Sequence, residues 1–127
     1  MLAAAAMAAV AFTSGGEGSR GETASGPVAT AATLPAAQTR GGLAVWVAQG
    51  CGSCHTLAAA NAHGTFGPDL GVSLAGTSAA AIRRSIVDPR AEAAAGYETG
   101  MMPDDYATRI APRDLDRLVA FLRAGAG

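Results

Sequence analysis

The chain has 127 residues, which is enough for one small domain, and half of its residues are apolar while only 5% are aromatic. The formal net charge is -1, and all nine basic residues are arginine, so no lysine is present. This balance argues against a basic surface for nucleic acid. A small, alanine-rich chain has few large side chains for a core, so we expect it to need a staple or a large ligand.

The N-terminal third is expected to lie outside the folded domain. Residues 1–12, "MLAAAAMAAVAF", are uncharged and apolar, but they are too short to span a bilayer, which needs about 20 residues. They are typical of the apolar part of a secretory signal peptide or of a membrane-anchor remnant, and residues 9–11 could form the cleavage site. Residues 13–39 are rich in Gly, Ser, Thr and Ala, which predicts a flexible linker that could tether the domain.

Three helices are expected between residue 40 and the end of the chain. The first lies within residues 40–50, the second begins after Thr77 or Ser78 and runs to residue 87, and the third covers residues 112–125. The connections contain many Gly and Pro residues and should be long loops. No segment favours a strand, so the domain at 40–127 is predicted to be all-α with three to four helices.

The segment "CGSCH" contains the only two cysteines, Cys51 and Cys54, followed directly by His55. A disulfide between them would close a tiny loop and constrain the unfolded chain little. A thioredoxin-like redox pair would need surrounding strands, which the sequence does not predict. A zinc site would have these two thiols and at most His63, whereas a structural zinc site needs four ligands.

Covalent attachment of haem explains the histidine as well as the two cysteines. Two thiols on one helical turn can reach the two vinyl groups along one edge of the porphyrin. The side chain that follows Cys54 then points to the ring centre, where His55 can bind the iron. A large planar ligand would also supply the core volume that the alanine-rich chain lacks.

A second iron ligand is expected on the other face of the haem, where histidine and methionine are the usual candidates. His63 follows His55 too closely to reach that face. Met101 and Met102 lie in a loop before the last helix, and adjacent residues of an extended segment point in opposite directions. Pro103 favours an extended conformation at Met102 and stiffens the loop there, so Met102 is the predicted ligand.

With these features in place, residues 40–123 resemble the small single-haem (class I) cytochrome c family. The resemblance is carried, in order, by "GLAVWVAQGCGSCH", "GTFGPDL", "GMMPDDY" and "LDRLVAFL". It implies a cytochrome c-like fold in which helices and long loops wrap one covalently attached haem c.

The resemblance also implies roles for individual residues. Cys51 and Cys54 resemble the thioether residues, His55 the proximal ligand and Met102 the distal ligand. Pro68 resembles the proline whose carbonyl accepts the second imidazole N–H, a contact that orients the ring.

Two further expectations concern packing and the haem propionates. Gly42 and Trp46 are expected to cross the last helix near Leu118 and Phe121. The partners of the propionates stay open, with five candidates: Arg83, Arg84, Arg90, Tyr97 and Tyr106.

The expected function is that of a single-electron carrier, not an enzyme, between respiratory complexes or dehydrogenases. Such encounters are small and transient, and a monomer is expected. As the resemblance implies, haem c is attached outside the bacterial cytoplasmic membrane, so the protein is expected in the periplasm or on the outer face of that membrane. The alternative is a catalytic or ligand-sensing haem from which the Met102 thioether is easily displaced.

Overall fold

A computed structural model describes residues 36–127, and the predicted signal segment and all but the end of the predicted linker lie outside this range. The described part is built mainly from helices: α1 (Ala36–Ala48), α2 (Leu70–Ser73), α3 (Ala79–Val87), α4 (Tyr106–Arg109) and α5 (Pro112–Gly125). Two short 3-10 helices, η1 (Cys51–Ser53) and η2 (Ala58–Ala60), lie between α1 and α2. The all-α prediction is confirmed.

Three details differ from the sequence-based expectations. Helix α1 begins at Ala36, inside the segment predicted as linker, because alanine is a strong helix former even where no apolar period is visible. The one-turn helices α2 and α4 lie in segments predicted as loop, so the helices outnumber the three to four expected. A pair of two-residue strands, β1 (Thr56–Leu57) and β2 (Ala62–His63), also forms, with Thr56 opposite His63.

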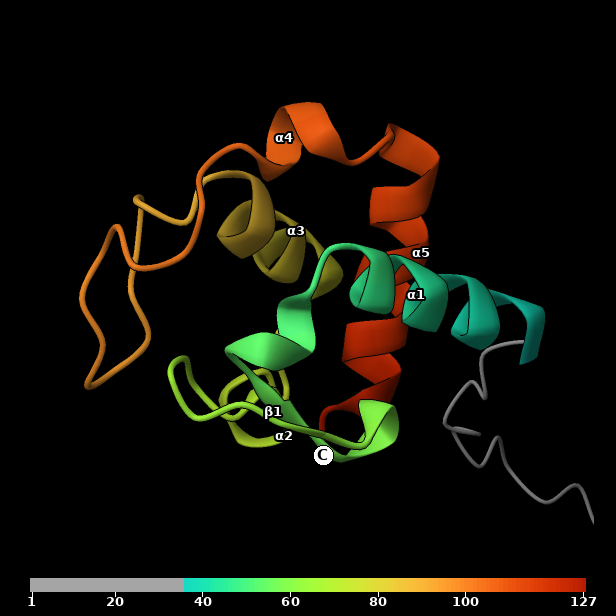
Figure 1. Cartoon of the computed structure of the whole chain (residues 1–127), viewed down its shortest axis with the longest axis horizontal. Helices are drawn as coiled ribbons and strands as arrows, with labels where there is room; N and C mark the ends of the chain where they lie inside the picture. Colours follow the sequence, from blue (N-terminus) through green and yellow to red (C-terminus); the bar gives the residue numbers. More distant parts are fainter. Residues whose placement is uncertain (1–35) are drawn as a thin grey trace, which may run out of the picture. The chain divides into compact units, whose positions relative to one another are not determined.

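Helices α1 and α5 cross and make the most extensive contact between elements of the described chain (Figure 1). A β-carbon placed at Gly42 would lie 2.3 Å from Phe121 Cβ and 2.4 Å from the Arg117 carbonyl oxygen, so only glycine allows this approach. Trp46 meets Phe121 edge to face, with 6.4 Å between the ring centroids. The predicted crossing of Gly42 and Trp46 with the last helix is therefore confirmed.

The core lies around this crossing. Its buried apolar side chains come from every long helix and from the segments beside them, and Leu57, Ile82, Leu118 and Phe121 are the most completely buried large ones. Helix α3 packs on α5 through Ile82 and Ile86, and Ser78 caps its first turn by accepting a hydrogen bond from Ala81 N at 3.2 Å. Among the described helices, none has both the length and the apolar character needed to cross a membrane.

The connection from α3 to α4, residues 88–105, is the longest stretch without a helix after α3. In the view of Figure 1 it extends away from the α1–α5 pair. From Ala94 to Asp105, every residue of this described stretch is exposed except Met102. The connection therefore adds little to the apolar core.

Candidate haem site

The two cysteines and His55 lie on one tight turn directly after α1. The carbonyl oxygen of Cys51 accepts hydrogen bonds from both Cys54 N, at 3.2 Å, and His55 N, at 3.0 Å. Residues 51–53 form the 3-10 helix η1, and the turn packs against the end of α1. The three side chains named by the sequence motif are therefore presented by one helical turn, as haem attachment requires.

The imidazole of His55 is oriented by Pro68, as predicted. His55 Nδ1 lies 2.9 Å from the Pro68 carbonyl oxygen. Because a carbonyl oxygen can only accept a hydrogen bond, Nδ1 carries the proton and donates it. The lone pair is then on Nε2, which is the atom left for a metal, and the hydrogen bond makes the ring a stronger ligand.

Gly67 also positions His55, and the sequence-based assignment of site residues missed it. A β-carbon at Gly67 would lie 2.6 Å from His55 Cε1 and 2.8 Å from Nδ1, so a side chain here would displace the ring. The amide N–H of Gly67 donates to the Cys54 carbonyl at 2.7 Å, which joins this loop to the cysteine turn. The signal was present in "GTFGPDL", where Gly67 precedes Pro68.

The structure weakens two alternative interpretations of the motif. No group of three or more His, Cys, Asp or Glu side chains that could hold a metal ion occurs in residues 36–127, and His63 is exposed. Both cysteines are free thiols. Burial raises the pKa of the Cys51 thiol to about 11. A cysteine that exchanges disulfides needs a lowered pKa, so a thioredoxin-like role is disfavoured.

The two methionines differ in the way the sequence predicted. Met102 is half-buried and packs against the core, whereas Met101 is 43% exposed. Both follow Gly100, which has a φ of +88°. Of the two thioethers, Met102 is the one that faces the interior of the domain.

The five candidates for the haem propionates are in different environments. Arg83 pairs with Asp116, Arg90 pairs with Asp104 at 2.6 Å, and Arg84 and Tyr97 are exposed. Tyr106 is buried, and the Arg109 guanidinium lies 5.1 Å from its ring centroid. Burial raises the pKa of the Tyr106 phenol, and the nearby Cys51 thiol acts in the same direction.

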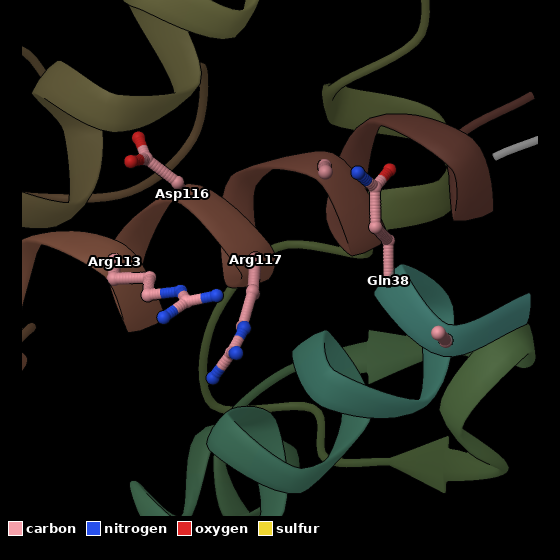
Figure 2. Close-up of a pocket in the computed structure, with 6 residues that line it drawn as sticks. Gln38, Arg113, Asp116 and Arg117 are labelled. Carbon is pink, nitrogen blue, oxygen red and sulfur yellow. The ribbon is translucent and has the colours of Figure 1, made fainter. Parts of the chain in front are cut away.

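A surface groove between α1 and α5 does not belong to this site. Figure 2 shows Gln38 from α1 and Arg113, Asp116 and Arg117 from α5 at this groove, which Ala37 and Ala120 complete. None of the cysteines, His55 or Met102 lines it.

The comparison with known families decides what the cysteine turn is for. The family model described as "Cytochrome c" matches residues 40–126, which is most of the chain. The chain belongs to the cytochrome c family. No curated protein and no solved structure matches it.

Membership in the cytochrome c family makes haem c, covalently bound and containing iron, the cofactor of this protein, and haem-based electron transfer its activity. The residues of the cysteine turn and of the loop beside it are chemically suited to bind haem c. The thiols are free, His55 keeps its Nε2 lone pair, and Gly67 leaves room for the imidazole ring. A soft thioether from Met102 is also available from a different part of the chain.

Proposed function

We propose that this protein is a single-electron carrier in which Cys51 and Cys54 attach haem c and His55 and Met102 bind its iron. The observation that carries the proposal is the hydrogen bond from His55 Nδ1 to Pro68, because it leaves the Nε2 lone pair free to bind a metal on the residue that directly follows the two free thiols in sequence. Haem c, when bound, supplies one iron that gains or loses a single electron.

The protein's own residues would keep the iron site similar in both oxidation states. His55 is held by Pro68 and by the close approach of Gly67, so its ring cannot turn easily. A neutral thioether favours the ferrous state more than a second imidazole does, so we expect a relatively high reduction potential. Enclosure of the haem by the half-buried residues Cys51, Cys54, His55 and Met102 would act in the same direction, because a low-dielectric environment disfavours the additional positive charge.

The surface charge of the chain and the attachment of haem c also support a proposal for its partners and its location. From Arg40 to the C-terminus the chain has eight arginines and eight acidic residues, so we expect no strong electrostatic preference for a highly charged partner. Brief encounters of a monomer with respiratory complexes or dehydrogenases fit this surface. An exported protein, in the periplasm or on the outer face of the cytoplasmic membrane, fits the attachment of haem c and the apolar residues 1–12.

The test is the visible spectrum of the holoprotein, together with a matched pair of methionine variants. We expect sharp absorption bands in the reduced protein and a weak far-red band in the oxidised protein, which reports a bond between iron and a methionine sulfur. Met102→Leu should abolish the far-red band and lower the reduction potential. Met101→Leu, which removes the exposed neighbour, should leave both unchanged.

Other results would change the assignment in defined ways. Loss of the far-red band in Met101→Leu and not in Met102→Leu would make Met101 the ligand. A high-spin spectrum in the unaltered protein, with ready binding of carbon monoxide or peroxide, would favour the catalytic or sensing alternative. A colourless protein, produced together with a haem-attachment system, would contradict the proposal as a whole.

A further inference from the structure

The segment that contains both methionines is weakly held by the rest of the domain. Its backbone N–H and carbonyl groups from residue 98 to residue 104 make no hydrogen bond to other parts of residues 36–127. Met102 is the one side chain of this stretch that packs against the core. Something besides backbone pairing must therefore keep the Met102 thioether directed inward.

Arg90 pairs with Asp104 just after the methionines, and its guanidinium lies near Gly100 just before them. Its Nε lies 2.6 Å from Asp104 Oδ2, just after Met102 and Pro103. A β-carbon placed at Gly100, just before Met101, would lie 3.8 Å from Arg90 Nη1. One guanidinium therefore lies close to both ends of the short run from residue 100 to residue 104 and is paired at the second end.

The backbone of Arg90 is better anchored than the segment it touches. Helix α3 ends at Val87, Pro89 is buried, and the amide N–H of Ala91 donates to the Asp88 carbonyl at 3.1 Å, so a turn holds Arg90 against the end of the helix. On the other side, Asp104 lies just before α4, whose first residue Tyr106 is buried. The ion pair thus connects two ordered elements across the exposed segment.

From this geometry we propose that Arg90 is a positioning residue for the distal ligand, which acts through Asp104 to keep Met102 at the haem iron. The inference depends on the proposed function, because it takes Met102 as the ligand. Both side chains are more than half exposed, at 64% and 54%, so the contribution is that of a solvated ion pair: modest and screened by salt.

The probe is imidazole, which competes with the methionine for ferric iron and removes the far-red band of the holoprotein. Arg90→Gln and Asp104→Asn should each lower the imidazole concentration for half-displacement by about two- to fivefold at low salt. The imidazole concentration for half-displacement should be no lower in the double variant than in either single variant, because the two single substitutions remove the same interaction. Arg90→Lys should recover part of the loss, and 1 M salt should reduce the difference between variant and unaltered protein.

Glu98→Gln is the matched control, because it removes a negative charge from the same exposed segment. Glu98 makes no ion pair with any residue in 36–127, so this variant should bind imidazole as the unaltered protein does. Equal effects of Glu98→Gln and Asp104→Asn would show that only net charge matters and would overturn the proposal.

Two further results would also overturn it. If Arg90→Gln weakens methionine binding while Asp104→Asn does not, Arg90 acts on another group, such as a haem propionate. If the effects of the two single variants multiply in the double variant, the residues act independently. Absence of the far-red band in the unaltered protein is a separate failure, because it removes Met102 as the ligand and this proposal with it.

Discussion

The α1–α5 crossing and the α3–α4 connection hold the two halves of the site in opposite ways. The crossing consists of buried aromatic and aliphatic side chains at a distance that only Gly42 permits, and the cysteine turn follows directly from α1. The connection is exposed, has few hydrogen bonds to the rest of the described chain, and contains the methionines. The proposed ligand His55 thus follows the most extensively packed part of the described fold, whereas the proposed ligand Met102 lies in an exposed part that can open locally.

The largest expected effect comes from removing an aromatic ring at the crossing. Phe121 is 1% exposed, so Phe121→Ala should lower the free energy of unfolding by about 3–5 kcal/mol, because it leaves a cavity between the two helices. Guanidinium unfolding of the holoprotein measures this. Val47→Ala is the control, since Val47 lies on α1, the other helix of the crossing, and is 69% exposed, so its truncation should change little. Similar losses in the two variants would contradict the importance of the crossing.

The next largest effect is a difference in the free energy of unfolding between alanine variants of two adjacent glycines of α1. Gly42→Ala should cost about 1–3 kcal/mol, because its β-carbon meets the backbone of α5 and the helices must move apart. Gly41→Ala meets only the flexible Arg117 side chain, at 3.2 Å, and alanine is the better helix former by about 1 kcal/mol, so it should be neutral or stabilising. If the two variants had equal free energies of unfolding, the close approach of α1 and α5 at Gly42 would not account for the stability of the crossing.

A smaller effect is expected in the connection itself. Gly100 has a φ of +88°, a conformation that costs other residues about 1–2 kcal/mol. Gly100→Ala should therefore strain the methionine segment and make Met102 easier to displace by imidazole. Amide hydrogen exchange should show the difference between the two regions: α1 and α5 should keep their protection while amides of the connection exchange faster. Reduced protection throughout the domain would instead mean that the two regions unfold together.

The smallest effect is the contribution of Tyr106, the first residue after the connection, to the loss of stability at alkaline pH. Burial raises the pKa of this phenol in the folded protein, so the folded state holds the proton more tightly than the unfolded state does. The resulting stability is complete below the phenol's usual pKa of about 10 and is lost as pH rises through the folded-state value. Tyr106→Phe should therefore lose less stability than the unaltered protein between pH 8 and pH 11. Tyr97→Phe, at an exposed position, should follow the unaltered protein.

Local patterns in the sequence were enough to predict the all-α class, the three long helices and the turn that contains Cys51, Cys54 and His55. The hydrogen bond from His55 to Pro68 and the contact of Gly42 and Trp46 with α5 were expected only from the resemblance to the cytochrome c family, because these residues are far apart in the sequence. Apolar spacing, proline and glycine act over a few residues, so their consequences can be read without the rest of the fold.

Other features depend on residues that meet only after folding. The early start of α1 escaped prediction because "AAQT" has no amphipathic period, and α2 and α4 are too short to leave a pattern. The fit of Gly67 under the His55 ring and the ion pair of Arg90 with Asp104 join separate parts of the chain. The sequence by itself determined that Cys51, Cys54 and His55 form a CxxCH-like arrangement suited to haem c, because that is a matter of residue type and spacing. Only the tertiary structure decided how firmly each is held, because that depends on burial and on contacts distant in the sequence.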